Sequence, residues 1–260
     1  MDGDMRESIF FTVAAAFLAL ACSDPPRPSR PLLDAALHGD LEQVRAHLHH
    51  GCDVNEAGKG GLTPLHHAAA FGHADIVSLL LDRGAEVDVR DEHGNTPLHL
   101  AANNLSYESA ALLVSRRADV NAKNAKGTTP LHSAARRRES FITEKDIVLF
   151  LISKGAEVNS TDNEGLTPLH RVASTWSVGT AEILISKGAE VDIEDGSGWT
   201  ALHHAAGMCT PEMIELLIAK GADKRSKNAQ GQTPAGVARE GRCPDEVVKL
   251  LTVEDLGVEK

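Results

Sequence analysis

One stretch of this chain is copied along most of its length. It begins with Gly61-Leu62-Thr63-Pro64-Leu65-His66-His67-Ala68-Ala69 and runs to Gly94. Its opening glycine returns as Gly94, Gly127, Gly165, Gly198 and Gly231, at intervals of 33, 33, 38, 33 and 33 residues. A fixed period of this size is typical of stacked helical units. The sequence therefore predicts one elongated array of repeats, not a globular domain.

The start of each copy carries a motif with a physical role. Thr-Pro-Leu-His recurs at 63–66, 96–99, 129–132 and 167–170, and becomes Thr-Ala-Leu-His at 200–203. A threonine hydroxyl can cap a helix N-terminus, and proline suits the first helical position because no intrahelical N–H bond is lost there. A short helix is therefore predicted after each threonine, followed by a second helix that is apolar on two sides.

A turn precedes each copy of the motif. Asp91-Glu92-His93-Gly94 has the Asp-first, Gly-fourth pattern of a type I turn. The same turn recurs with Asp first at 162–165 and 195–198, and with Asn first at 124–127 and 228–231. These turns are expected to project from the helices as a row of fingers.

Together, these motifs closely resemble the ankyrin repeat family over about residues 31–252. The resemblance implies an all-α solenoid of stacked helix–turn–helix repeats with projecting β-turn fingers. Full repeats start at 61, 94, 127, 165 and 198. Cap repeats are expected at 32–60 and 231–252, because one face of each terminal repeat must meet water. Residues 253–260 form a tail.

The resemblance also implies which motif residues are structural. The motif histidine would form a hydrogen bond with the capping threonine and with neighbouring backbone. The residues assigned to this framework are Thr63, Pro64, His66, His99, His132, His170 and His203.

By the same resemblance, the array should bind a protein partner through its finger tips and the exposed side of its first helices, which form a concave strip. The residues at these positions vary between repeats. The candidate contacts are Leu62, His67, Leu100, Leu166, Arg171, Trp176, Trp199 and His204. Trp199 is the preferred single residue because tryptophan is enriched in binding hot spots. Packing of its ring across the next finger is the alternative.

The repeat from Gly127 contains five extra residues where its first helix meets its second. This segment includes the basic triplet Arg136, Arg137 and Arg138, followed by Phe141. On an acidic protein, these residues are a second candidate contact with a partner. The alternative is a longer first helix with a solvated, charged end.

Arg117 replaces a glycine that follows the second helix in the other repeats. The corresponding residues are Gly51, Gly84, Gly155, Gly188 and Gly221. Glycine is favoured at this place because a left-handed residue commonly ends a helix. A left-handed arginine costs roughly 1–2 kcal/mol, so either the turn differs at Arg117 or the repeat tolerates strain.

The N-terminal residues predict export. Residues 9–21 form an uncharged apolar run of 13 positions, which suits the apolar region of a signal peptide better than a membrane span. Ala19-Leu20-Ala21-Cys22 resembles a bacterial lipobox in which Cys22 is the lipidated residue. Simple cleavage after Ala21 and an uncleaved anchor are the alternatives.

The predicted N-terminal region consists of a signal peptide over 1–21 and a proline-rich tether over 22–31, with either Met1 or Met5 as the start. It predicts a membrane-anchored lipoprotein that faces the periplasm or the cell surface.

The composition and the missing motifs exclude several classes of function. The formal net charge of −11 disfavours nucleic acid as a partner. The sequence has no Gly-x-Ser-x-Gly, His-Glu-x-x-His, P-loop or dinucleotide motif. We therefore expect a monomeric, non-enzymatic protein-binding scaffold without a cofactor, which meets the membrane only through its lipid. The alternatives are an enzyme with an unrecognised site, and an inhibitor or accessory factor of one secreted enzyme.

The spacing of stacked helices also bears on metal sites and disulfides. Equivalent residues in stacked helices lie ~8–10 Å apart, whereas the ligand nitrogens of a zinc ion lie ~2.0–2.1 Å from it. The histidines are therefore not expected to bind a metal. The same spacing disfavours a bridge between Cys209 and Cys243, because a disulfide needs Cα atoms within ~7 Å, although the bridge stays possible.

Overall fold

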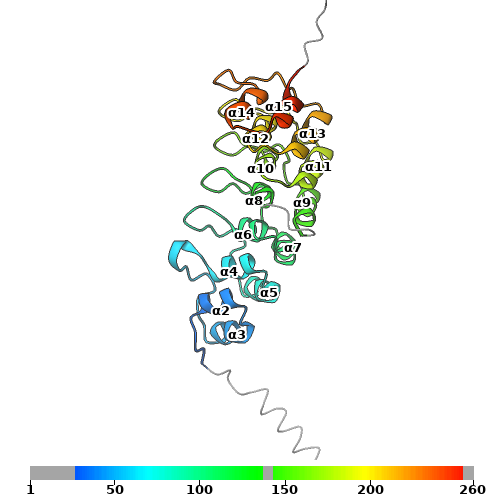
Figure 1. Cartoon of the computed structure of the whole chain (residues 1–260). Coiled ribbons are helices and arrows are strands. Elements are labelled where there is room, and N and C mark those ends of the chain that lie inside the picture. Colours follow the sequence, from blue (N-terminus) through cyan, green and yellow to red (C-terminus); the bar gives the residue numbers. More distant parts are fainter. Residues whose placement is uncertain (1–26, 137–142, 254–260) are drawn as a thin grey trace, which may run out of the picture.

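The computed structural model of the chain describes residues 27–136 and 143–253. Over these residues it forms seven helix pairs stacked along one axis, with loops projecting to one side (Figure 1). No strand occurs in the described ranges. The all-α repeat solenoid predicted from the sequence is confirmed.

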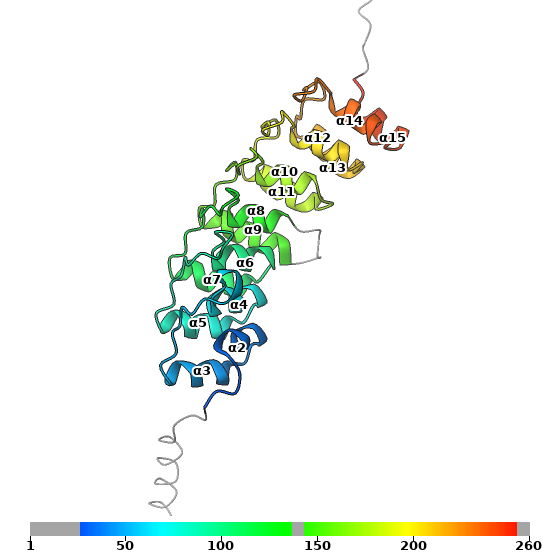
Figure 2. The same ribbon diagram turned by 90° about the vertical axis from the view of Figure 1, so that its left-hand side faces the viewer.

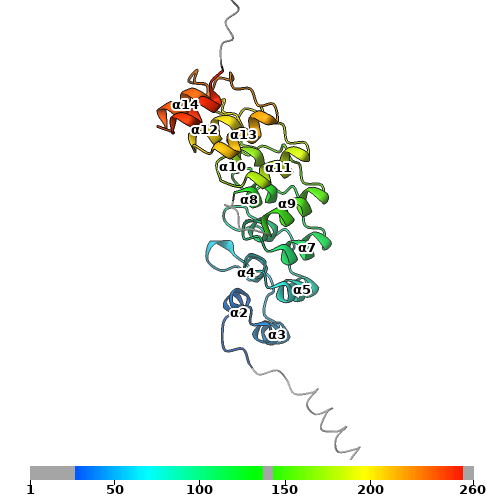
Figure 3. The ribbon, with the colours of Figure 1, turned by 45° about the vertical axis from the view of Figure 1, so that its right-hand side comes forward.

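Each helix pair contributes one helix to each of two parallel columns (Figure 3). The first helices are α2 (Leu32–His38), α4 (Pro64–Phe71), α6 (Pro97–Asn103), α8 (Pro130–Ala135), α10 (Pro168–Ala173), α12 (Ala201–Gly207) and α14 (Pro234–Glu240). The second helices are α3 (Leu41–His49), α5 (Ala74–Asp82), α7 (Tyr107–Ser115), α9 (Thr143–Ser153), α11 (Val178–Ser186), α13 (Pro211–Ala219) and α15 (Asp245–Leu251). A short 3-10 helix, η1 (Lys59–Gly61), precedes α4.

The two columns are held together by aliphatic packing between neighbouring repeats. First helices pack on first helices and second helices on second helices, as α4 does on α6 and α5 on α7. Ala68 and Ala69 are fully buried and carry little bulk, so neighbouring helices can approach closely. Because each repeat covers its neighbours, the core is continuous along the elongated, gently curved stack (Figure 2).

The predicted finger turns are present, and their glycines are required by two constraints. Gly94 N donates to Asp91 O at 2.9 Å, and the fingers from Asn124 to Asn228 close in the same way. Gly94 has a φ of +73°, and a Cβ atom on it would lie 2.8 Å from the backbone nitrogen of Ala125 in the next finger. A side chain there would push the fingers apart, because adjacent fingers are joined by backbone hydrogen bonds such as Ala125 N to His93 O at 2.9 Å.

Several non-glycine residues occupy left-handed positions. Arg117 has a φ of 70°, so of the two alternatives left open by the sequence, the repeat keeps the left-handed turn with an arginine in it. Leu105, Cys209 and Arg242 also have positive φ, in the turns between the first and second helices of their repeats.

The repeat with the insertion differs from its neighbours in its second helix. The first helix, α8, ends at Ala135 and is not extended, whereas α9 has 11 residues and α7 has 9. Arg136 caps α8 and is exposed. Arg137, Arg138 and Phe141 lie outside the described residues. The longer first helix considered from the sequence is therefore not formed.

The disulfide between Cys209 and Cys243, which the sequence did not favour, is present with a Cα–Cα distance of 5.4 Å. The expectation was wrong because it applied the spacing of helix axes to residues in turns. Cys209 and Cys243 both follow the ends of their helices, α12 and α14. The spacing of helix axes does not set the distance between these turn residues, so their Cα atoms can lie within the limit for a disulfide. The bridge ties the last full repeat to the C-terminal cap.

In the two described ranges, every helix is too short or too polar to cross a membrane.

Candidate protein-binding surface

The motif histidines form a buried row that joins each repeat to the next. In every copy, the peptide N–H of the motif threonine donates to Nδ1 of the histidine at 3.0–3.2 Å. The Nε2 atom lies 2.9–3.1 Å from a backbone carbonyl oxygen of the next finger. Because Nδ1 accepts, Nε2 must carry the hydrogen and donate it. This geometry confirms the structural hydrogen bonds expected of His66, His99, His132, His170 and His203.

These histidines are held in the neutral form. Burial lowers the pKa of all five, since the charged imidazolium would lose its hydration. The pKa of His170 falls to about 4, because burial is reinforced by the neighbouring His204. The motif histidines are therefore part of the framework and are not accessible to a partner.

The residue after each motif histidine lies instead on the concave side of the first helices. We call these residues the floor row: His67, Leu100, Ser133, Arg171 and His204. All five are half-buried. The framework row and the floor row are thus adjacent in sequence but differ in accessibility.

A cavity of about 500 Å³ opens between the fingers and the first helices at the centre of the concave side. Its helix side includes Leu100, Asn103, Ser133, Arg136 and Arg171. Its finger side includes Glu92, His93, Asn95, Lys126 and Glu164. The structure thus brings the predicted contacts Leu100, Arg136 and Arg171 together in one place.

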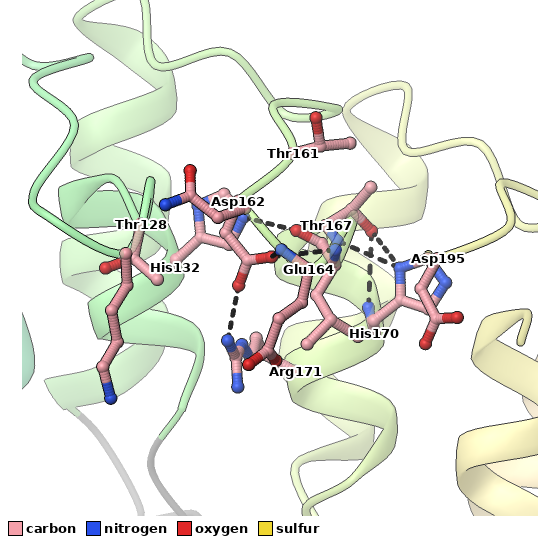
Figure 4. A network of polar contacts seen from close by, with 12 residues as sticks. Thr128, His132, Thr161, Asp162, Glu164, Thr167, His170, Arg171 and Asp195 are labelled. Carbon is pink, nitrogen blue, oxygen red and sulfur yellow. Dashed lines mark hydrogen bonds and ion pairs between the residues drawn. The ribbon is translucent and has the colours of Figure 1, made fainter. Parts of the chain in front are cut away.

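Arg171 is fixed by a buried carboxylate of the finger that precedes it (Figure 4). Asp162 Oδ1 accepts hydrogen bonds from the peptide nitrogens of Glu164 and Leu166, at 2.9 and 3.0 Å. Its Oδ2 accepts from Arg171 Nη2 at 2.5 Å, and the Asp162 side chain is only 1% exposed. One carboxylate therefore both shapes the finger and orients the guanidinium.

His204 is held in the same way in the next repeat. Asp195 Oδ1 accepts from Ser197 N and Trp199 N, while Oδ2 accepts from His204 Nε2 at 2.9 Å. Burial by itself would raise the pKa of the Asp195 carboxyl, but the hydrogen bonds from Trp199, His204 and Ser197 lower it below its ordinary value. Asp195 therefore stays ionised and holds its finger against α12.

Ser174, His204 and Asp195 follow one another in a hydrogen-bonded chain, with Ser174 Oγ 3.3 Å from His204 Nδ1. These are the residue types of a hydrolase triad. Ser174 caps the C-terminal end of α10, and its single hydroxyl hydrogen is donated to His170 O at 3.1 Å. A helix C-terminus presents carbonyl oxygens, which disfavour a developing oxyanion. The arrangement positions His204 and does not favour catalysis.

Trp199 is half-buried and lies along its own first helix. Its ring centroid is 5.9 Å from that of His203 and 5.3 Å from that of His204. A Cβ atom on Gly207 would lie 3.7 Å from the indole, so the ring extends over a bare part of α12. The indole is therefore packed against α12 and is partly accessible on the concave side.

The remaining predicted contacts are spread more widely. Trp176 is 52% exposed in the turn between α10 and α11. Leu62 and His67 are half-buried near the N-terminal end of the array. Leu166 is only 8% exposed, so its side chain is not available to a partner as the sequence analysis expected. Its peptide nitrogen donates to Asp162 Oδ1, and its carbonyl oxygen accepts from His132 Nε2.

Sequence reasoning missed the finger carboxylates as part of the site. Asp162 and Asp195 were assigned only to turns, although each reaches the floor residue nine positions later. The recurring nine-residue spacing between a finger aspartate and a floor Arg or His is the signal that could have identified them. In the described ranges, no group of three or more His, Cys, Asp or Glu side chains is placed to hold a metal ion.

Comparisons with known proteins agree with this geometry. The family model for ankyrin repeats (3 copies) matches residues 32–124, 117–195, 140–228 and 177–260. The search of curated proteins gave no match. Among solved structures, the human ASB11 ankyrin repeat domain is 26% identical with a TM-score of 0.74, over 86% of this chain and 98% of that chain.

The ankyrin repeat domain of Bcl-3, described as a unique member of the IkappaB protein family, is also similar. It is 29% identical with a TM-score of 0.69, over 86% of this chain and 99% of that chain. The family model covers most of the described array, and its matches coincide with the helix pairs and fingers. The chain belongs to the ankyrin repeat family.

Proposed function

We propose that this protein is a non-enzymatic scaffold at the bacterial cell envelope that binds a protein partner through its concave surface. Ankyrin repeats generally mediate protein–protein interaction. The observation that carries the proposal is the contrast between the two adjacent rows. The framework histidines are buried and identical in five repeats, whereas the floor row is half-buried and varies among them, with four residue types at five positions.

The C-terminal part of the concave surface is the favoured anchor for the partner. Trp199 offers a partly accessible indole beside His204, and both are held by Asp195. A rigid aromatic group with a polar neighbour is typical of binding hot spots. Because Trp199 and His204 are already fixed, little conformational entropy would be lost on binding.

Export and anchoring are supported by two independent features. The lipobox-like Ala19-Leu20-Ala21-Cys22 makes Cys22 the candidate site for a lipid. The Cys209–Cys243 disulfide is a bond that persists in oxidising compartments and is rare in the cytosol. Both features agree with an array tethered by lipid outside the cytoplasm.

The binding proposal is tested by cross-linking the tagged protein in envelope membranes and titrating the purified partner. Trp199→Ala should weaken binding by at least ~2 kcal/mol, or roughly thirtyfold. Tyr107→Ala is the matched control, since Tyr107 is an exposed aromatic residue on the second helix α7 and is not a predicted contact. Unchanged affinity in the Trp199 variant would exclude the concave anchor.

If the partner is a secreted enzyme, its activity with and without the array separates an inhibitor or accessory factor from a scaffold. Anchoring is tested by labelling cells with a fatty acid. The label should mark the wild-type protein and not Cys22→Ser. Persistence of the label in the variant, or a cytosolic wild-type protein, would contradict the lipid anchor.

A further inference from the structure

We propose that the central concave cavity binds a carboxylate side chain from an acidic, extended segment of the partner, through Arg136 and Arg171. This inference rests on the proposed function and specifies the chemistry of the partner. Both arginines line the same cavity of about 500 Å³. Arginine suits this role because its planar group of N–H donors matches the geometry of a carboxylate.

Comparison of the repeats shows that these two arginines depart from the pattern together. In the floor row, the residue after the motif histidine is an arginine only at Arg171. Three residues further along the first helix, the copies carry Ala70, Asn103, Arg136, Ser174 and Gly207, so an arginine again occurs once. The two departures fall in neighbouring repeats, on α10 and at the end of α8, which pack against each other.

Arg171 is oriented before any ligand arrives. Asp162 accepts one N–H of its guanidinium and is otherwise satisfied by two peptide N–H groups. A guanidinium carries five N–H donors, and the Arg171 side chain remains 27% exposed. The ion pair therefore fixes the plane of the guanidinium while leaving other donors for a ligand.

The positive charge of Arg171 is partly neutralised by Asp162, so Arg136 is the second source of positive charge in the cavity. It is exposed, and within the described part of the chain it has no ion pair. A carboxylate in the cavity would thus meet one oriented guanidinium and one uncompensated positive charge.

The finger side of the cavity narrows the choice of ligand. Glu92 and Glu164 line it, with Lys126 between their fingers. These glutamates repel an acidic group at the finger tips, so the carboxylate must point toward the helices. In an extended segment, successive side chains point to opposite sides. The matching partner therefore presents acidic side chains to the helices and neutral or basic ones to the fingers.

The test uses short, terminally blocked peptides with a neutral fluorophore, in which Ala alternates with Glu, Gln or Lys. The net charge of −11 alone would repel the Glu peptide. We expect the Glu peptide to bind more tightly than the Gln peptide by fluorescence anisotropy. Arg136→Gln should weaken Glu-peptide binding about tenfold or more, because charge-assisted hydrogen bonds are lost.

Arg45→Gln is the matched control, since it makes the same change of charge on α3, away from the cavity. Arg171→Lys keeps the charge but loses the fork of donors, and should weaken binding less than Arg136→Gln. The stability of the Arg171→Lys variant is checked by thermal unfolding, because a weaker ion pair would leave the buried Asp162 carboxylate poorly compensated. Arg136→Gln leaves the Arg171–Asp162 ion pair intact, so its effect on peptide binding is not caused by a loss of folding.

The inference is overturned if the Glu peptide binds no better than the Gln peptide, or if Arg136→Gln and Arg45→Gln have equal effects. Its failure is distinct from failure of the proposed function. A partner that requires Trp199 but tolerates Arg136→Gln would retain the scaffold and remove the carboxylate site. If the Glu peptide requires Arg136 but no partner requires Trp199, the carboxylate site would be retained and the proposed anchor of the scaffold removed.

Discussion

Side-chain hydrogen bonds between neighbouring repeats occur in both halves of the array, such as Asn124 Nδ2 to Asn95 Oδ1 in the N-terminal half, but the strongest links differ. In the C-terminal half, side chains link separate elements: the disulfide Cys209–Cys243, and the pairs Arg171–Asp162 and His204–Asp195. In the N-terminal half, Asp91 bonds to Asn95 within its own finger, and the ion pair Arg116–Asp82 between repeats is exposed to solvent. Exposed pairs contribute little to stability.

This difference bears on recognition. The pairs Arg171–Asp162 and His204–Asp195 join fingers to first helices, and these are the elements that form the concave surface. A surface fixed before binding loses less entropy when a partner arrives. The C-terminal half is therefore expected to act as the preformed anchor, and the N-terminal half to adjust to the partner by small motions between repeats.

The largest expected effect tests the disulfide. Replacing Cys209 and Cys243 together by alanine should destabilise the array by about 3–4 kcal/mol, because their separation of 34 residues restricts the unfolded chain. Repeats contact only their neighbours, so the loss should be confined to α12–α15. Urea unfolding and hydrogen exchange measure the size and the place of the effect.

Cys52→Ala is the control, since Cys52 is a free cysteine at the N-terminal end. Unchanged amide protection in α12–α15 after loss of the bridge would contradict the comparison between the halves. A thiol assay adds a direct check: denatured Cys22→Ala protein without reductant should show one reactive thiol, at Cys52.

The next effect is acid sensitivity centred on His170. Its pKa is lowered to about 4 by burial and by His204, so between pH 6.5 and 4 the unfolded chain binds a proton that the folded chain excludes. Stability is complete above about pH 6.5 and falls as the pH drops toward 4, by roughly 3 kcal/mol for this group. Urea midpoints at about pH 7.5 and pH 5 measure the change.

His170→Gln should be less stable than the wild type at neutral pH and lose less stability on acidification. His66→Gln makes the same change in the N-terminal half, where His204 is absent. If acidification affects both variants as it does the wild type, the buried histidines are not the cause of the acid sensitivity.

The sequence predicted the framework well because its determinants are local. The motif threonine and histidine lie three residues apart and satisfy each other wherever a helix starts, and each finger glycine is needed by its own turn. The position of Arg117 followed from the same register.

The links between elements were not predictable in the same way. The pairs of Asp162 with Arg171 and of Asp195 with His204 depend on how far a side chain reaches from a finger to a helix. The disulfide depends on turn geometry, which the spacing of helix axes does not describe. The burial of Leu166 depends on the packing of its finger, although its position in the repeat is shared with the half-buried Trp199.

A smaller effect is expected at Arg117, between the two halves. Arg117→Gly should stabilise the array by about 1 kcal/mol, because glycine adopts a positive φ without the side-chain penalty. Gly84→Ala is the reciprocal control: a Cβ atom there meets nothing within 4 Å, so only backbone strain is added. A loss of stability in Arg117→Gly would show that the arginine side chain makes compensating contacts.

The smallest expected effect concerns a buried hydroxyl in each half. Ser109 in α7 and Thr180 in α11 are fully buried, and among the residues that the structure describes their hydroxyl oxygens have no hydrogen-bond partner. Both lie 13 residues after their motif threonine, where other repeats place Ile76 and Met213 in the core. These hydroxyls are therefore polar groups at apolar positions.

Thr180→Val keeps the shape of the side chain and removes the unsatisfied hydroxyl, so it should raise the free energy of unfolding by about 0.5–1 kcal/mol. Ser109→Ala makes the corresponding change in the N-terminal half. In urea unfolding, equal gains would show that the buried hydroxyls are a cost common to both halves, leaving the disulfide and the ion pairs as the features that distinguish them. A loss in Thr180→Val would instead mean that its hydroxyl is satisfied in solution, and that the C-terminal half holds one more polar link between its helices.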